Sequence, residues 1–182
     1  MFVARMSLKK DIRKFSAEEL IAELEKTGEP KFRAKQVYEW LWKKSARSFD
    51  EMTNLSKDLR TKISEEFLLQ TVEENIVQKS KDGTVKLGMK LHDARLIEGV
   101  MIPEEDRSTA CVSSQVGCSL SCSFCATGFL KRERNLDAGE IYDQVVLLNK
   151  HALQHNNRQL TNIVYMGMGE PLLNYDNVMK SI

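Results

Sequence analysis

The sequence predicts an α/β fold made of three successive parts. Apolar residues recur at helical spacing up to about residue 70, alternate with polar residues from 72 to 103, and then follow a strand–helix–strand order. These patterns are typical of a helical domain, an antiparallel β segment and the opening βα units of a partial parallel barrel. We therefore expect a helical domain at 1–70, a β extension or linker at 71–103, and the N-terminal part of a barrel at 104–182.

The helical domain is predicted from a cap and from apolar spacing. The stretch Ser16-Ala-Glu-Glu19 is a capping box, and Leu20 and Leu24 follow it one turn apart. A later group repeats the four-residue step: Leu55, Leu59, Ile63 and Phe67. About three short helices account for these signals.

Cations gather in this domain between residues 31 and 47. Six basic residues face one acidic residue and are interleaved with rings: Lys31, Arg33, Lys35, Lys43, Lys44 and Arg47 with Glu39, and Phe32, Tyr38, Trp40 and Trp42. Such a surface suits a phosphate backbone whose bases can stack. The pattern alone favours a plainer interpretation, a helix with one apolar stripe and a solvated basic face. That stripe would comprise Phe32, Val37, Leu41 and Trp42.

The β extension is predicted from alternation around a tight turn. Val85, Leu87, Met89 and Leu91 alternate with polar or small residues, after an Asp82-Gly83 pair suited to a hairpin. A later strand carries Glu98 in the same register as three apolar side chains, Leu96, Val100 and Ile102. A desolvated carboxylate there would suit a proton acceptor near neutral pH, whereas the pattern alone favours an exposed strand with Glu98 in water.

The barrel part begins with a strand, a helix and a second strand. Asp137-Ala-Gly-Glu140 caps a helix that carries apolar residues on one face, and the next strand, 160–166, stops at Gly167-Met-Gly169-Glu-Pro171. Turns at the carboxyl ends of parallel strands are where such folds bind ligands. Val178 and Ile182 fall one turn apart in a last helix without a cap, so we expect the front part of a longer protein.

The overall composition is that of a globular protein. The 182 residues carry a net charge of +1 and 42% of them are hydrophobic, which argues against a polycation and against disorder. No apolar run approaches the roughly 18 to 20 residues that cross a bilayer, and the start lacks the apolar stretch of a signal peptide. We expect no membrane association and a cytoplasmic location.

All four cysteines lie in one short window, at Cys111, Cys118, Cys122 and Cys125. A disulfide scaffold would spread them along the chain, so this density indicates metal or redox chemistry. The last three form a CxxxCxxC spacing that differs from the paired motifs of structural zinc sites. Three thiolates leave one iron of a four-iron cluster open to a cofactor, although spacing alone also allows Cys111 as a fourth ligand.

CxxxCxxC with Phe124 before its last cysteine resembles the signature of the radical S-adenosylmethionine (SAM) superfamily. Three strings carry a closer resemblance: the run from Cys111 to Cys118, Arg134-Asn-Leu136, and Met166-Gly-Met-Gly-Glu-Pro-Leu-Leu-Asn174. Together they resemble the RlmN-type dual-specificity RNA methyltransferases, which modify C2 of an adenosine in large-subunit ribosomal RNA and in certain tRNAs. The resemblance extends to the helical part through Ser48-Phe-Asp-Glu-Met-Thr-Asn-Leu55.

The resemblance implies two cofactors, a 4Fe-4S cluster and S-adenosyl-L-methionine, on a partial radical-SAM barrel. The open iron would chelate the amino and carboxylate groups of SAM. The implied cluster ligands are Cys118, Cys122 and Cys125, and the implied SAM contacts are Phe124, Gly169 and Glu170.

The resemblance also implies a radical route to the product. C2 of adenine is electron-poor and does not attack a methyl cation, whereas a carbon radical can add to it. In the family, one SAM methylates a cysteine in the C-terminal part, and a second SAM yields the radical that activates that methyl group. Glu98 matches the family's proton acceptor, and Cys111 matches the thiol that helps release the RNA by forming a disulfide with the methylated cysteine. This chain ends before that cysteine, so we expect it not to complete turnover alone.

The implied partners are rRNA, tRNA and a flavodoxin- or ferredoxin-like reductant, for a protein that acts as a monomer. In this context we favour an RNA-contacting role for the region 31–47. One departure is the segment 129–133, Phe-Leu-Lys-Arg-Glu, where many relatives have a glycine followed by an aromatic residue. The loop beyond the cluster would then differ in shape.

Three alternatives stay open. A resistance-type methyltransferase acting at C8 of adenine is the nearest, and the sequence separates it poorly from the C2 enzymes. A zinc-stabilised RNA-binding module would use all four cysteines for one ion. A redox CxxC at Cys122 and Cys125 lacks the surrounding thioredoxin-like βαβ unit. The histidines His92, His151 and His155 have no partners at metal-ligand spacing, and we interpret them as ordinary surface or core residues.

Overall fold

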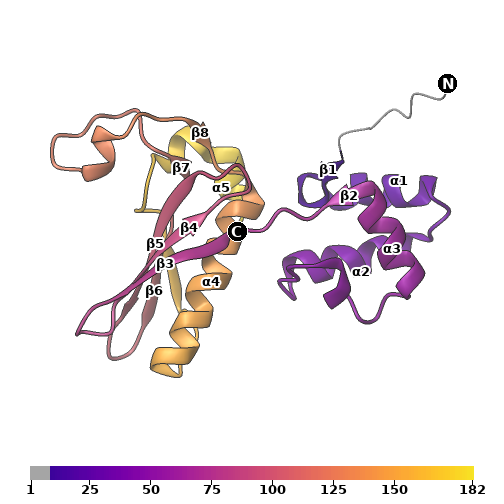
Figure 1. Ribbon diagram of the computed structural model, residues 1–182, viewed down its shortest axis with the longest axis horizontal. Helices are drawn as coiled ribbons and strands as arrows, with labels where there is room; N and C mark the ends of the chain where they lie inside the picture. The colour runs from indigo at the N-terminus through magenta and orange to yellow at the C-terminus, as the bar shows by residue number, and fades with distance from the viewer. Residues whose placement is uncertain (1–8) are drawn as a thin grey trace. The chain divides into compact units, whose positions relative to one another are not determined.

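The structure, a computed structural model, describes residues 9–182 and divides into two compact units (Figure 1). The first unit ends at Gln70, and the second spans Thr71–Ile182. The first is mainly helical and the second is a mixed α/β unit, in agreement with the predicted fold class.

Within residues 9–70 the first unit has three α-helices and two short 3-10 helices. The α-helices are α1 (Ala17–Lys26), α2 (Lys31–Trp42) and α3 (Lys57–Glu66), and the 3-10 helices are Ile12–Lys14 and Phe49–Glu51. The predicted capping box is confirmed: Ser16 Oγ accepts from the Glu19 N–H at 3.2 Å, and the Ser16 N–H donates to Glu19 Oε2 at 2.8 Å. One feature was not predicted, a short parallel pair of β1 (Lys10–Asp11) with β2 (Phe67–Leu68).

The core of this unit corrects two details of the apolar pattern. Val37 and Leu41 of α2 are buried as expected, but Phe32 is 52% exposed and does not belong to the buried stripe. Leu55 and Phe67 are buried but lie outside α3, because Ser56 caps that helix and Phe67 follows its last turn in extended conformation. The four-residue spacing therefore predicted correctly which residues are buried, but it predicted a longer helix than the structure has.

The second unit is built on a five-stranded sheet within its described residues. Its strands stand in the order β3 (Glu73–Lys79), β4 (Val85–Lys90), β5 (Leu96–Pro103), β6 (Ser108–Cys111) and β9 (Asn162–Val164). Neighbours from β3 to β6 are antiparallel, and β6 pairs in parallel with β9. The remaining elements are α4 (Ala138–Asn156), α5 (Tyr175–Lys180), a 3-10 helix at each of Ala126–Phe129 and Pro171–Asn174, and the antiparallel pair β7 (Gln115–Val116) with β8 (Arg134–Asn135).

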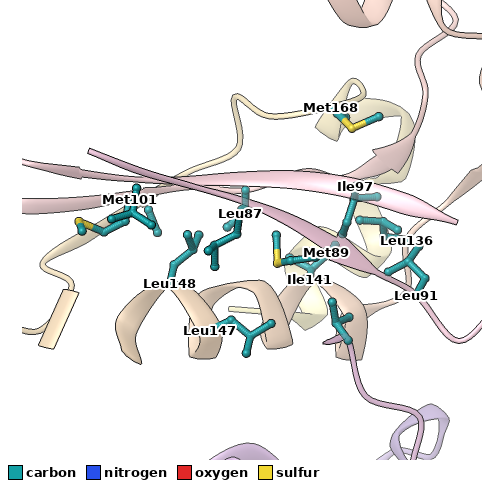
Figure 2. Packing of buried hydrophobic residues seen from close by; sticks show 14 of the residues in the cluster. Leu87, Met89, Leu91, Ile97, Met101, Leu136, Ile141, Leu147, Leu148 and Met168 are labelled. Atoms are coloured by element: carbon teal, nitrogen blue, oxygen red, sulfur yellow. The ribbon is translucent and has the colours of Figure 1, made fainter. Parts of the chain in front are cut away.

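Helix α4 covers one face of the sheet and closes the main core (Figures 1 and 2). The predicted cap is present, since Asp137 Oδ1 accepts from the Glu140 N–H at 2.9 Å. Leu87 of β4 and Ile97 of β5 pack with Leu148 of α4, all fully buried. At Gly99 of β5 the packing is close, because an added Cβ would lie 3.2 Å from Leu148 Cδ1 and 2.8 Å from Met89 Cε.

The second parallel strand and the last helix are both shorter than the sequence predicted. The strand predicted over 160–166 is reduced to Asn162–Val164, and α5 ends at Lys180, so Ile182 lies outside it and is 84% exposed. The hairpin between β3 and β4 is confirmed, with Gly83 at φ 87°. In residues 9–182 we find no helix with the length and apolar character needed to span a membrane.

Candidate functional site

A cavity of about 440 Å³ opens beside the carboxyl ends of the two parallel strands. Strands β4 and β5, the end of β6, the cysteine loop and the turn after β9 all contribute to its wall. The lining residues are Lys86, Glu98, Gly99, Val100, Cys111, Phe124, Cys125, Ala126, Thr127, Met166, Gly167 and Met168. Four residues singled out from the sequence thus share one cavity, although they come from separate segments: Glu98, Cys111, Phe124 and Cys125.

The turn after β9 is fixed to the segment that follows β6. The Ser114 N–H donates to the Met168 carbonyl at 2.9 Å, and the Gly167 N–H donates to the Val112 carbonyl at 3.0 Å. The buried Ser113 hydroxyl accepts from the Met168 N–H at 2.8 Å and donates to the Glu98 carbonyl at 2.6 Å. A single hydroxyl therefore joins the strand that carries Glu98 to the turn, a link that the sequence did not reveal.

Gly169 and Glu170, the predicted SAM contacts, have a structural role in this turn and do not line the cavity. Gly169 has φ +95°, and an added Cβ would lie 2.5 Å from Gln115 Cβ. Glu170 Oε1 accepts from the Leu172 N–H at 3.0 Å and caps the following 3-10 helix. Gly167 and Met168 are the residues of this turn that reach the cavity.

Glu98 has a different environment from the desolvated one considered above. Its side chain is 52% exposed, and its Oε1 lies 2.8 Å from Lys86 Nζ. This is the exposed strand that the pattern alone favoured, because α4 covers the other face of β5, where Ile97 and Met101 are buried. Lys86 was missed, although the hairpin register, which pairs Gly88 with Glu98, places it diagonally across from the carboxylate on the same face.

Cys111 ends β6 and is partly buried. Burial raises the pKa of its thiol, while the Met166 backbone N–H acts in the opposite direction. The thiol is therefore protonated at neutral pH until something in the site removes the proton. It forms no disulfide within the described residues.

The cysteine loop between β7 and β8 has the donor chemistry for an iron–sulfur cluster but does not gather its three sulfurs. Backbone N–H groups of Gly128 and Thr127 lower the pKa of the Cys125 thiol, which favours the thiolate that binds metals. Cys118 borders a second cavity of about 490 Å³ instead. Among the described residues, no group of three His, Cys, Asp or Glu side chains is arranged to hold a metal ion. The donor set fits a cluster in type, and closing around it requires the loop to rearrange.

Arg134 ties the end of this loop to the start of α4. Its guanidinium donates to both carboxylate oxygens of Glu140, at 2.8 and 2.7 Å, and to Asp93 Oδ2 at 2.7 Å. Glu140 is almost fully buried, with 4% of its side chain exposed. The hydrogen bond to Glu140 is the main cause that raises the pKa of Arg134. His92 lies beside the same carboxylate, with Nδ1 3.4 Å from Glu140 Oε1.

Asp93 is expected to make stability depend on acid pH. Burial acts to raise its pKa, but hydrogen bonds from Arg134 and the Arg95 backbone prevail and hold it at about 2, below the usual 3.8. The carboxylate therefore stabilises the fold above its unfolded pKa, by about 2 kcal/mol, and this contribution is lost as pH falls through about 2. Urea unfolding of Asp93→Asn should show that deficit at pH 7 and a shrinking one at lower pH.

The exposed Asp106→Asn is the matched control and should change stability by less than about 0.5 kcal/mol at either pH. A deficit in Asp93→Asn that stays constant down to about pH 2 would contradict the assignment of that pKa.

Comparison with known proteins shows which sequences this chain is similar to. Residues 10–69 match the family model described as the ribosomal RNA large subunit methyltransferase N-terminal domain. A probable dual-specificity RNA methyltransferase RlmN of Cytophaga hutchinsonii is 60% identical over 174 residues, covering 96% of this chain and 48% of the relative. The corresponding protein of Flavobacterium johnsoniae is 52% identical, with coverage of 96% and 50%.

A crystal structure of a radical SAM methyltransferase from Sphaerobacter thermophilus superposes on 94% of this chain and 50% of that chain, with a TM-score of 0.83 and 39% identity. The parallel strands, the CxxxCxxC loop and this likeness define the second unit as part of a radical SAM methyltransferase fold, as predicted. More particularly, the relatives that it matches over 96% of its length are RlmN-type dual-specificity RNA methyltransferases. It spans about half the length of the curated relatives that it matches.

Proposed function

We propose that this chain supplies the RNA-binding unit and the first half of the active site of an enzyme that methylates C2 of adenosine in rRNA and tRNA. The observation that carries the proposal is the shared cavity, which holds Phe124 and Cys125 of the cysteine loop beside Glu98 and Cys111. A structural module would have no need to bring a cluster ligand, a carboxylate and a separate thiol to one opening. A protein of this type also needs a flavodoxin- or ferredoxin-like reductant, and we place it in the cytoplasm as a monomer.

Cys118, Cys122 and Cys125 would hold the cluster in this proposal. A 4Fe-4S cluster with bound SAM would supply the radical that activates the methyl group for addition to an electron-poor carbon such as C2 of adenine. Phe124, which is 91% exposed, offers a ring face to the adenine of SAM, and Gly167 and Met168 of the turn after β9 line the cavity with it.

Glu98 and Cys111 would act on the RNA base. Glu98 Oε1 lies 2.8 Å from Lys86 Nζ, and this ion pair holds the carboxylate at the cavity wall, where it can accept the proton that C2 loses. Cys111 lies in the same cavity, where its thiol can take part in releasing the RNA.

The first unit would hold the RNA through α2 and the loop after it. Lys44 Nζ lies 4.1 Å from the Trp40 ring centroid and the Arg33 guanidinium lies 4.8 Å from that of Phe32. Phe32 is 52% exposed and Trp40 is partly buried, so the two cation–ring pairs present charge together with stacking surface, as single-stranded RNA requires. Part of the charge is offset, since Lys43 Nζ lies 3.7 Å from Glu39 Oε1.

Anaerobic reconstitution with iron and sulfide tests the proposal. The chain is expected to take up about four irons and to turn brown, while Cys118→Ala, Cys122→Ala and Cys125→Ala each lose most of the iron. Cys111→Ala is the matched control and should keep it, because Cys111 serves as a thiol and not as a ligand. One bound zinc per chain would reject the cluster in favour of a zinc-stabilised module. An equal loss of iron in all four variants would make Cys111 a fourth ligand and reject the open iron that SAM needs.

The position of methylation needs a full-length protein that contains this chain. Mass spectrometry of treated RNA should find 2-methyladenosine, and Glu98→Gln should reduce its yield at least about a hundredfold, the scale of a general base. Detection of 8-methyladenosine would assign the chain to the C8 enzymes.

A further inference from the structure

The first unit contains a cavity that the proposed chemistry does not use. It has a volume of about 380 Å³, and it lies between the loop that contains Arg47, helix α3 and strand β2. Arg60 and Ser64 of α3 line it together with Arg47, and Phe67 and Leu68 form its apolar part. Its size falls within the range of roughly 300–1,000 Å³ that is common for small-ligand sites.

Arg60 has a buried donor without an acceptor. Its Nη1 donates to the Asp50 carbonyl at 2.6 Å, which fixes the guanidinium plane. Its Nε is buried, and within the described residues it has no hydrogen-bond partner. Buried polar groups in native proteins are almost always satisfied, so this N–H points to an acceptor that comes from outside the chain.

The charges around the cavity favour an anion. Lys9 Nζ donates to the Ser64 carbonyl at 2.8 Å and adds a third cation to Arg47 and Arg60. Two carboxylates oppose them. Asp50 lines the cavity, and Glu51 is already engaged by the Arg47 N–H and the Ser48 hydroxyl, at 3.1 and 3.2 Å. The excess of positive charge and the planar guanidinium suit a phosphate oxygen.

The apolar part distinguishes a nucleotide from a bare anion. Leu68, which is 41% exposed, and the buried Phe67 both line the cavity. A ribose or base that packs on Leu68 would cover this apolar surface while its phosphate reaches Arg60. Both needs are met by one nucleotide unit of an RNA strand.

We propose that this cavity holds one nucleotide of the bound RNA, with its phosphate on Arg60 and its sugar or base on Leu68. The proposal rests on the proposed RNA-binding function and goes beyond the basic face of α2, because it names a cavity formed by the loop at Arg47, helix α3 and strand β2. It predicts a contact with a defined group, the Arg60 guanidinium, in place of a diffuse charge effect.

Binding of a fluorescein-labelled tRNA transcript to the chain, measured by anisotropy at several salt concentrations, tests the site. Arg60→Gln should weaken binding about tenfold and reduce the slope of log K against log salt by about 0.7 to 0.9, the value of one phosphate contact. Ser64→Leu fills the cavity without changing a charge and should weaken binding to a similar extent. Lys26→Gln removes the same charge outside the lining and should change affinity less than about twofold.

A second measurement uses the unsubstituted chain, so its result does not depend on whether a variant folds correctly. In ¹H–¹⁵N spectra the Arg60 Nε–H resonance should shift on addition of the tRNA and, more weakly, of inorganic phosphate. If the tRNA binds but Arg60→Gln and Ser64→Leu bind like the parent, the nucleotide site is wrong and the RNA-binding function stands. If phosphate shifts the resonance but no tRNA binds, RNA is excluded as the occupant and the proposed RNA-binding function fails with it.

Discussion

Replacing Arg134 with methionine is expected to lower the free energy of unfolding of the second unit by about 3 kcal/mol, the lower end of the range for breaking a buried ion pair. Methionine keeps much of the aliphatic volume but leaves Glu140 without its two hydrogen bonds from the guanidinium. That carboxylate is 4% exposed and cannot regain water without opening the start of α4. Asp93 loses a hydrogen bond at the same time.

Hydrogen exchange of the amides in α4 and β5 measures this change in the unit where it occurs. Both tryptophans, Trp40 and Trp42, lie in the first unit, so their fluorescence follows that unit separately and its urea midpoint should not move. The matched control is Arg107→Met. Arg107 also bonds a glutamate, at 2.6 Å, but 56% of its side chain is exposed, and the loss should stay below about 0.5 kcal/mol. If Arg134→Met and Arg107→Met lower the free energy of unfolding equally, Arg134 does not anchor the cysteine loop.

The parts of the fold that the sequence predicted are those decided by near neighbours. The caps at Ser16 and Asp137 and the turn at Gly83 depend on residues within a few positions of each other, and all three are confirmed. The same local logic cannot decide an environment that depends on a distant element. Alternation placed Glu98 correctly on one face of its strand, but only the packing of α4 decides which face is covered.

The candidate site likewise contains residues that the sequence identified and residues that it did not. Motifs identified Glu98 and Cys111, and the structure brings both to one cavity, yet neither motif nor periodicity indicated Lys86, whose place beside Glu98 follows from strand register. The Arg60 cavity was also invisible, because its residues are drawn from a loop, a helix and a strand that each look ordinary alone. A site whose residues are brought together only by tertiary packing has no characteristic spacing in the sequence, so sequence motifs do not reveal it.

Substituting alanine at Gly169 is expected to destabilise the second unit by about 3 kcal/mol and to deform the cavity. A side chain at φ +95° costs about 1–2 kcal/mol, and overpacking adds a similar amount. The added Cβ would lie 2.5 Å from Gln115 Cβ and 2.8 Å from the Gln115 backbone N, and backbone cannot rotate away as a flexible side-chain tip can. The hydrogen bond from the Glu170 N–H to Gln115 Oε1, at 3.0 Å, would be strained first.

Gly28→Ala separates the backbone effect from the contact effect. Gly28 has φ +84° but no atom within 4 Å of an added Cβ, so its loss should be limited to the backbone share of about 1–2 kcal/mol. Urea unfolding gives both losses, and chemical shifts of Met168 and Ser113 show whether the turn has moved in Gly169→Ala. If the two glycine variants lose the same stability and those shifts do not change, then Gln115 yields to the methyl group. In that case the requirement for glycine at 169 is one of backbone conformation alone, and the turn is not held in place by its contact with the segment after β6.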